Sequence, residues 1–524
     1  MFKVDLSEMV ERSSGTVILG KAQRMTSNTE NQSRVSIGAV LAVLAVIAIA
    51  AATRSWGLGE RPMWLDETLT IWYARQALAD LWGSILGLEP HPPLYNTLQH
   101  FWLAFGVLTV PLVFLLGSTV AGNRTGFAVG LLAALIFAIA PLQVQFGQEA
   151  RAYAALAAAN TLLLCGAAWL VRHPSAMSVS PWTALSGGGG WPPPLAWAAV
   201  VAGSVLSLWF HNTAAFYVAI LFLFALVWLT VDGLWRREVV INLLVVFVVI
   251  LLLWAPYLPW LWQHTREVGR EFWIAAPGSA DLVHTARELF GAVYLWRFGP
   301  PAEALFAALA AWGAWSLART RGWPIAALLL CAVILPAVVH LLASIAFKPI
   351  FLTRPLISSA VPFYVLVAAG VMALPWKVIR IAMFATVLVL QARALTNFTQ
   401  TFTKEPWNRA VDAVLAEAGP DDVVYVYPQF AAVPFQHHLG AATTSVEVRP
   451  LPVPFPQGGI RALPLDKAAR ARLSAERKEW PRAWLVMRLT PHLKVREDVE
   501  LAVRQDRRTA LDKKFKQIRV WRYE

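Results

Sequence analysis

Long apolar runs recur along most of this 524-residue chain, and they constrain its fold more than any other feature. Each run approaches the roughly 20 residues that a helix needs to cross a bilayer. Only 15% of the residues are charged, whereas about 25% are charged in an average soluble domain. Lipid offers no partner to an unpaired backbone N–H or C=O group, so the runs must be helical. The sequence therefore predicts a polytopic α-helical membrane protein and excludes an ordinary cytosolic enzyme.

We expect about eleven membrane-spanning helices, each built on one of these runs. Their expected bounds are 37–53, 103–121, 125–141, 153–171, 195–211, 213–231, 239–255, 301–317, 324–345, 355–374 and 378–395. Cys165 and Cys331 lie within two of the runs, so we expect both to be small, buried, apolar side chains. A structural disulfide and a cysteine-based zinc site are not expected.

The cationic residues of the short loops indicate how the chain is oriented in the membrane. With a cytoplasmic N-terminus they all fall on the cytoplasmic side, as the positive-inside rule requires. They are Arg124, Arg172, Arg236, Arg237, Arg319, Arg321, Lys377 and Arg380. Topology is thus the simplest cause of the net charge of +13, and a nucleic-acid partner is not expected.

The remaining polar segments predict the domain organisation. We expect a polar cytoplasmic leader over 1–36, a membrane domain over 37–395 and a soluble α/β domain over 396–524 on the outer side. Two outer segments, 54–102 and 256–300, belong to the membrane domain, and 173–194 is expected to be a disordered cytoplasmic linker. In the soluble domain we expect a helix near Trp407–Ala418 and strands at Asp422–Tyr427, Ala483–Leu489 and Gln517–Tyr523.

The sharpest local feature is a pair of adjacent carboxylates, Asp66 and Glu67, close to the membrane edge after the first span. The segment His91–Tyr95 follows in the same outer loop and contains two prolines, which restrict the chain before a new helix. A purely structural interpretation is that Asp66 and Glu67 cap a helix that starts at Thr68. Capping and chemistry are compatible, because a helix N-terminus favours an ionised carboxylate.

A second charged motif, Gln148–Tyr153, opens the fourth span on the same outer face. Charged groups at membrane depth are costly and are usually paired or functional. Glu149 and Arg151 are candidate site residues, although capping by Glu149 and snorkelling by Arg151 would explain them equally well. Because independent charge arguments place this motif and Asp66 on one face, we expect the two to converge.

Other candidates are scattered along the outer side. His211 ends the fifth span, where an interfacial role is the simpler reading. Lys348 and Arg354 flank a short outer loop, where a cation could hold an anionic lipid head group or could be a plain topological charge. The segment Lys404–Trp407 opens the soluble domain just above the membrane.

Together these motifs resemble the GT-C superfamily of membrane glycosyltransferases, specifically the bacterial glycosyltransferase family 39-like proteins, relatives of protein O-mannosyltransferases and of the lipid A aminoarabinose transferase. The resemblance covers nearly the whole chain. Its landmarks, in order, are Trp64–Glu67, His91–Tyr95, Gln148–Tyr153, Phe351–Arg354 and Lys404–Trp407. The sequence departs from the family pattern at Pro355 and Pro406. It also looks shortened at Phe105–Val107, which suggests a short second span preceded by an interfacial helix over Leu94–Phe105.

The resemblance implies a GT-C fold and transfer of a sugar from a polyprenyl-phosphate donor to an envelope lipid, glycan or protein. The reaction would take place on the outer face of a bacterial inner membrane. It implies Asp66 as catalytic base and Glu67 as a helper in orientation or metal binding, with Glu149 and Arg151 shaping the site. The implied substrate-binding residues are His91, Arg151, Tyr153, His211, Lys348, Arg354, Lys404 and Trp407, of which Arg354, Lys348 and His91 would neutralise the leaving phosphate.

A divalent cation, Mg²⁺ or Mn²⁺, is a further expectation, held by the oxygen ligands of Asp66 and Glu149. Three alternative functions stay open: a transporter or flippase of a lipid-linked sugar, a catalytically inactive envelope scaffold, and a polymerase or ligase of surface polysaccharide. A transporter would show internal repeats and broken mid-membrane helices, and the sequence reveals neither.

Overall fold

The computed structural model describes residues 36–84, 86, 88, 91–122, 125–179, 193–268, 274, 276–440, 446–489 and 496–524. The expected leader over 1–36 lies outside these residues except for Ser36, and so does most of the expected linker, 180–192. The chain divides into two compact units, 1–45 and 46–524. The described part of the first unit is Ser36 and the beginning of helix α2. All contacts reported below lie within the second unit.

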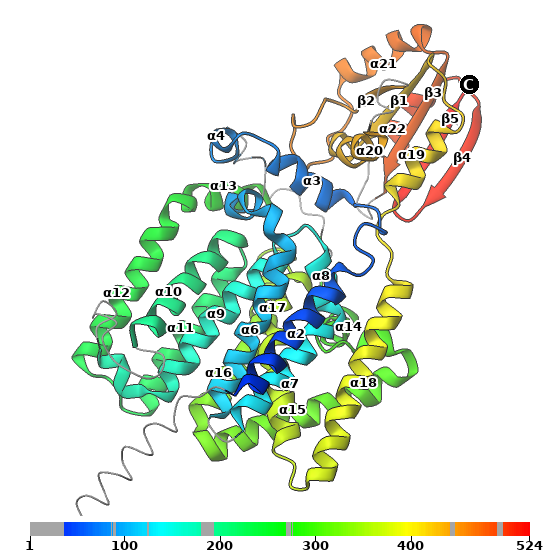
Figure 1. The fold of residues 1–524 in the computed structure, drawn as a ribbon. Coiled ribbons are helices and arrows are strands. Elements are labelled where there is room, and N and C mark those ends of the chain that lie inside the picture. Colours follow the sequence, from blue (N-terminus) through cyan, green and yellow to red (C-terminus); the bar gives the residue numbers. More distant parts are fainter. Residues whose placement is uncertain are drawn as a thin grey trace, which may run out of the picture. The chain divides into compact units, whose positions relative to one another are not determined.

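Helices account for nearly all of the structure up to residue 401 (Figure 1). The α-helices are α2 (Ile37–Ser55), α3 (Leu65–Ala74), α4 (Leu78–Leu81), α5 (Pro93–Thr97), α6 (Trp102–Ala121), α7 (Gly126–Ile139), α8 (Pro141–Gln148), α9 (Tyr153–Arg172), α10 (Pro193–Phe210), α11 (Ala214–Val231), α12 (Arg237–Trp254), α13 (Leu258–Val268), α14 (Ser279–Leu289), α15 (Gly299–Arg321), α16 (Trp323–Ala346), α17 (Ile357–Met372) and α18 (Lys377–Thr401). Short 3₁₀ helices are η1 (Gln99–Phe101), η2 (Pro174–Ser178), η3 (Ala255–Tyr257), η4 (Ala292–Phe298) and η5 (Arg354–Leu356).

The expected polytopic membrane protein is confirmed, but its number of spans differs. Among the described residues, nine helices are long and apolar enough to cross a membrane, or ten if the bent pair α7 and α8 forms one span. All eleven expected spans are helical. Helix α15, expected to span over 301–317, does not reach that apolar content because Glu303 and several proline, tryptophan and glycine residues stand among its apolar positions.

The second span is not shortened. Helix α6 runs for 20 residues and continues through Pro111. The expected interfacial helix over Leu94–Phe105 is wrong, because that segment consists of α5, η1 and the first turn of α6.

Small residues allow the most buried helices to approach closely. A methyl group built on Gly313 of α15 would lie 2.0 Å from the backbone oxygen of Leu366, and one on Gly370 of α17 would lie 2.0 Å from that of Leu309. Close crossings of this kind are typical of membrane helices, whose association depends on van der Waals contact. Cys165 and Cys331 are both free, as expected; Cys165 is buried and Cys331 is half-buried.

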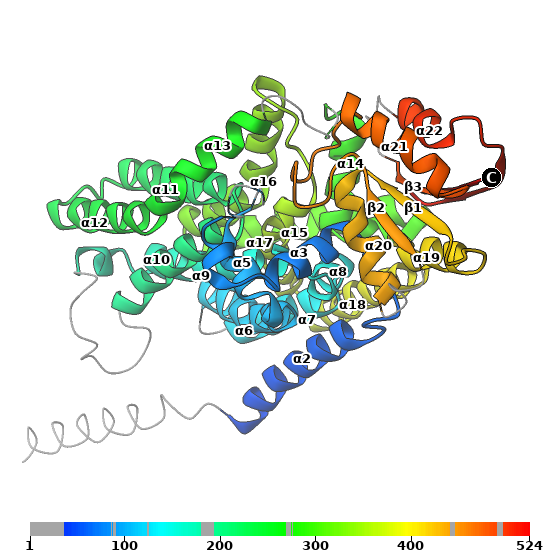
Figure 2. The ribbon, with the colours of Figure 1, turned by 90° about the horizontal axis from the view of Figure 1, so that it is seen from above.

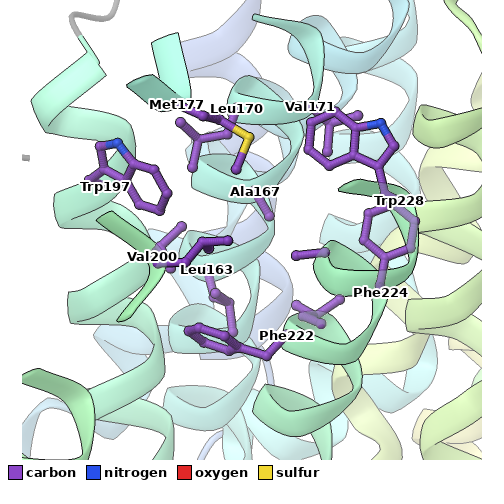
Figure 3. A pocket seen from close by; sticks show the side chains of 13 residues that line it. Leu163, Ala167, Leu170, Val171, Met177, Trp197, Val200, Phe222, Phe224 and Trp228 are labelled. Atoms are coloured by element: carbon purple, nitrogen blue, oxygen red, sulfur yellow. The ribbon is translucent and has the colours of Figure 1, made fainter. Parts of the chain in front are cut away.

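A small apolar cavity lies within this helical core (Figure 3). It has a volume of about 50 Å³ and lies among α9, α10 and α11, beside η2. Met177, Trp197, Val200, Phe224 and Trp228 are among its lining residues. Its lining offers no ionisable side chain, so this cavity is part of the packed core.

The C-terminal part contains a five-stranded sheet in the order β2-β1-β3-β5-β4. Its strands are β1 (Asp422–Tyr427), β2 (Glu447–Pro450), β3 (Arg482–Arg488), β4 (Thr509–Phe515) and β5 (Ile518–Tyr523), and its helices are η6 (Gln429–Ala431), α19 (Trp407–Leu415), α20 (Ala432–Leu439), α21 (Lys467–Glu479) and α22 (Arg496–Arg504). Strand β1 pairs in parallel with β2 and β3, and β5 pairs antiparallel with β3 and β4. The strands expected from sequence correspond to β1, β3 and β5, whereas β2 and β4 were missed.

Helix α20 packs on α3, and the two helices lie side by side in both views (Figure 1, Figure 2). Phe430 and Val433 form a hydrophobic cluster with Leu65 and Leu69. His438 Nε2 also lies 2.8 Å from the backbone oxygen of Met63. These contacts fix the C-terminal sheet against the segment that carries Asp66 and Glu67.

Candidate active site

Helix α3 presents the two adjacent carboxylates in its first turn. The helix begins at Leu65, three residues before the start expected from sequence. Glu67 Oε2 accepts the backbone N–H of Trp64 at 3.4 Å, so Glu67 does cap this helix. Asp66 is not used in that cap. The capping interpretation is therefore correct for Glu67. The Asp66 carboxylate does not cap the helix and can interact with other groups.

Glu67 joins three segments that are far apart in the sequence. Its Oε2 atom forms an ion pair with Lys404 Nζ at 2.7 Å, and its Oε1 atom accepts the backbone N–H of Ala150 at 3.2 Å. Both side chains of the ion pair are less than a tenth exposed. Glu67 thus holds α3, the Glu149 segment and the start of the C-terminal domain together.

Asp66 lies in a cluster of cations. Its Oδ2 atom is 2.9 Å from Arg354 Nη1, and the Arg354 guanidinium lies over the Trp64 ring at 4.7 Å. Arg151 Nη1 donates to the Asp66 backbone oxygen at 3.3 Å and to Thr70 Oγ1 at 3.1 Å. Burial alone would raise the pKa of Asp66, but Arg151 and Arg354 outweigh it and hold that pKa below its ordinary value. Asp66 is therefore ionised at neutral pH.

Glu149 has a different environment. It follows α8, is buried, and accepts the side-chain N–H of Gln145 at 3.1 Å through Oε1. Within the described part of the chain, its Oε2 atom is buried without a hydrogen-bond partner. The pKa of Glu149 is raised to about 7, mainly by burial; nearby Glu67 adds to this shift, and Lys404 opposes it. Glu149 can therefore carry a proton at neutral pH and donate a hydrogen bond.

A cavity of about 160 Å³ opens beside these groups. Its lining residues are Trp64, Gln145, Glu149, Arg354, Phe402, Thr403, Lys404, Glu405, Lys516 and Gln517. Asp66 does not line the cavity, but it is ion-paired with Arg354, which does. Glu149 and several cations thus line one concave site, and the ion pair with Arg354 holds the Asp66 carboxylate next to it.

A basic groove of about 470 Å³ adjoins the cavity and shares Lys404 and Lys516 with it. The groove also contains Arg61, Arg409 and Lys514, and Glu60 is its one acidic residue among the lining residues described. Arg61 Nη1 donates to Gln148 Oε1 at 3.1 Å. Of these groove residues, only Lys404 was a candidate from sequence. No local sequence pattern indicates that the turn between β4 and β5 lies near the start of α3.

His91 and His211 form a second, tighter cluster next to Arg151. Their rings lie 4.7 Å apart and border a cavity of about 10 Å³ together with Tyr95. Burial, with Arg151 and His340, lowers the pKa of His211 to about 3. Burial, with His211 and Arg151, lowers the pKa of His91 well below its ordinary value. The lowered pKa values favour the neutral form of both rings, and the role of His91 in neutralising a phosphate stays a prediction. Tyr153 lies 5.7 Å from the His211 ring and is buried.

Comparison with solved structures identifies the fold. ArnT from Cupriavidus metallidurans in the apo state matches with a TM-score of 0.57 and 13% identity, covering 92% of this chain and 97% of that one. The same protein bound to undecaprenyl phosphate gives a TM-score of 0.56 with the same identity and coverage. The chain has the GT-C fold.

An oligosaccharyltransferase from Archaeoglobus fulgidus also matches, with a TM-score of 0.49 and 13% identity over 86% of this chain and 69% of that one. No family model matches the sequence, and no curated protein does. The assignment of the fold rests on the likeness to ArnT, which covers 92% of this chain.

Two further candidates from sequence, Lys348 and Trp407, also lie outside the lining of the 160 Å³ cavity. Lys348 is exposed in the loop after α16 and lines neither the cavity nor the basic groove. Trp407 is fully buried in the core of the C-terminal sheet, where its Nε1–H donates to Glu405 Oε2 at 2.9 Å. Trp407 therefore supports Glu405, which lines the cavity, and is not itself accessible.

The expected divalent-cation site at Asp66 and Glu149 stays a prediction. Across the described residues, no three His, Cys, Asp or Glu side chains gather as a metal site would require. Asp66 is ion-paired with Arg354, and Glu67 is ion-paired with Lys404. This donor set does not fit a bound divalent ion in the present arrangement.

Proposed function

We propose that this multi-pass membrane protein is a glycosyltransferase that moves a sugar from a polyprenyl-phosphate donor to an envelope lipid, glycan or protein. One observation carries this proposal: Glu149 and Arg354 line one cavity, and Arg354 is ion-paired with Asp66 beside it. The GT-C fold of the chain supports it, since ArnT has been crystallised with undecaprenyl phosphate. We place the reaction on the outer face of a bacterial inner membrane, with the N-terminus in the cytoplasm, from the loop charges.

The donor phosphate is the natural partner of Arg354. A guanidinium binds phosphate with two parallel hydrogen bonds, so an incoming phosphate competes with Asp66 for Arg354. Donor binding would then free the Asp66 carboxylate at the moment when it is needed. Lys404 and Lys516 line the same cavity and add positive charge for the leaving phosphate.

The freed Asp66 acts as the general base. It takes the proton of an acceptor hydroxyl while the hydroxyl oxygen attacks the anomeric carbon of the sugar. The bond between that carbon and the phosphate oxygen breaks, and polyprenyl phosphate leaves with the electron pair. Atoms and charge balance without another reactant, and no step runs through a metal ion.

Glu149 has a positioning role in this proposal. Its protonated form would donate a hydrogen bond into the cavity from Oε2, the oxygen that lacks a partner in the described structure. A carboxylic acid kept neutral by burial can hold a sugar hydroxyl or a phosphate oxygen without adding negative charge. Asp66 and Glu149 thus have separate tasks because their environments move their pKa values in opposite directions.

The decisive experiment is a transfer assay with purified full-length protein, a radiolabelled polyprenyl-phosphate sugar and extracted envelope acceptors. We expect a labelled product together with free polyprenyl phosphate, and no product from Asp66→Asn. Comparing envelope glycans and glycolipids by mass spectrometry, with and without the protein, would identify the sugar and the acceptor. Wild-type transfer by Asp66→Asn would remove Asp66 as the base.

A transporter of a lipid-linked sugar is the second candidate, and one observation favours it. Helices α7 and α8 are bent by 57° at Ala140 and Pro141, a break that the sequence did not reveal. Broken helices are typical of transporters, although here Pro141 explains the break by starting α8 without an N–H donor. In detergent solution a transporter forms no glycosidic bond, so the same assay separates the two functions.

A further inference from the structure

We propose that Arg172 and Arg321 form a binding site for a phosphate-bearing anion at the end of α9 that lies away from Glu149. Helix α9 has 20 residues and separates the two places by about 30 Å. A cavity of about 550 Å³ lies there, between the ends of α6, α7, α9, α15 and α17. The proposal is independent of the glycosyltransferase function.

The two guanidinium groups converge on Gly122, the residue after α6. A methyl group built on Gly122 would lie 2.7 Å from Arg321 Cζ and 2.9 Å from Arg172 Nη1. The guanidinium groups are therefore within about 6 Å of each other. Gly122 has a φ of +72°, so both its backbone conformation and the lack of a side chain make room for this pair.

No described carboxylate balances these two charges. The Arg172 Nη1 atom donates to the Thr119 backbone oxygen, and none of the described residues that line the cavity is acidic. Each arginine ends a helix, where it is favoured by the helix dipole and by the positive-inside rule. Those reasons explain each arginine separately, but they do not explain why two like charges share one cavity. An anion between them would offset the repulsion.

The surroundings favour phosphate as that anion. Guanidinium groups bind phosphate through two parallel hydrogen bonds, and two of them can hold one phosphate from both sides. The 14-residue helix α7 also begins at this cavity, with Thr125 and Val129 in the lining. Backbone N–H groups at a helix start favour negative charge. Basic pockets between membrane helices bind phospholipid head groups, so the phosphate can come from a lipid or from a soluble compound.

Binding to the full-length protein in detergent tests the site. After lipid removal, the probes are phosphatidylglycerol, phosphatidylcholine and inorganic phosphate, and the readouts are native mass spectrometry and the thermal unfolding midpoint. The variants are Arg321→Gln and Arg172→Gln, which keep most of the side-chain length. The matched control is Arg319→Ala, because Arg319 is on the same turn of α15 but stacks on Trp315.

We expect each Gln variant to weaken binding by about tenfold, the typical effect of losing one charge-assisted contact, and Arg319→Ala to leave it unchanged. Arg321→Lys should recover part of the binding, which a purely structural role would not predict. Preference for phosphatidylglycerol identifies a lipid head group, and equal protection by inorganic phosphate identifies a soluble phosphate compound. Equal losses in Arg319→Ala and Arg321→Gln, or no binding of any probe to the wild type, would overturn the proposal.

Discussion

Lys404 Nζ lies 2.7 Å from Glu67 Oε2, although 337 residues separate the two in the chain. This buried ion pair joins the segment at the start of the C-terminal domain to the first turn of α3. The neighbouring residue, Asp66, is held in the same way by Arg354, 288 residues away. The candidate site therefore exists only when α3, η5 with Arg354 and the segment before α19 with Lys404 are folded together.

Breaking the Lys404–Glu67 pair should destabilise the protein strongly. We expect Lys404→Ala to lower the free energy of unfolding by about 3–5 kcal/mol, because it leaves the buried Glu67 charge without its partner. Lys348→Ala is the control, since Lys348 is an exposed cation whose loss should change stability by less than about 0.5 kcal/mol. Denaturant unfolding in detergent, followed by Trp fluorescence, measures both. Equal stability of the two variants would mean that the pair does not hold the domain in place.

Asp66 and Glu149 should respond differently to neutral replacements. We expect Asp66→Asn to lower kcat/KM by at least about 10²-fold because a general base is lost, while the thermal unfolding midpoint changes little. Glu149→Gln should keep most of the activity at neutral pH, since an amide can donate the hydrogen bond of the protonated acid. Steady-state kinetics on both variants checks this. The opposite pattern would identify Glu149 as the base.

The acidic limb of the pH profile should depend on Arg354. In the proposed mechanism transfer requires ionised Asp66, and Arg354 helps to hold the pKa of Asp66 below its ordinary value. In Arg354→Ala the pKa of Asp66 should rise. On acidification the variant should therefore lose activity at a higher pH than the wild type does. The pH dependence of kcat/KM, which reports on the free enzyme, measures the shift. Lys348→Ala removes an exposed cation from the segment before Arg354 and should not change the pH at which activity falls.

Glu149 should make the folded state less stable as the pH rises. Its pKa is raised from 4.5 in the unfolded chain to about 7, so the folded state binds the proton more tightly. This contribution is complete below pH 4.5 and is lost as the pH rises through about 7. Glu149→Gln should therefore show a flatter dependence of the unfolding midpoint over this range. Parallel curves for the two proteins would contradict the raised pKa.

Removal of divalent metal should leave transfer unchanged. Arg354 and Lys404 neutralise the two carboxylates of α3, and the described residues assemble no set of three metal ligands. The measurement is activity after treatment with EDTA, with and without added Mn²⁺ or Mg²⁺. Loss of activity that Mn²⁺ restores would instead support the metal site expected from sequence at Asp66 and Glu149.

Local features explain what was predictable from the sequence. Every expected span is helical, because an apolar run in lipid has no other way to satisfy its backbone. Strand β1 was predictable because all six of its residues are buried and most are β-branched or aromatic. Strand β4 was missed because most of its residues are exposed and polar. Helix α15 shows the limit of the pattern: it is long enough to span, but Glu303 and its proline, tryptophan and glycine residues make it less apolar than the other spans.

The sequence by itself determined that this chain is a polytopic helical membrane protein, and it singled out the two acidic motifs that we propose for the site. The tertiary structure alone decided which cation each carboxylate meets, that Glu149 is protonatable while Asp66 is ionised, and that Arg172 and Arg321 share a cavity. The reason is physical: helix formation and capping depend on neighbours within a few residues, whereas a pKa or an ion pair depends on groups that only folding brings within a few ångströms.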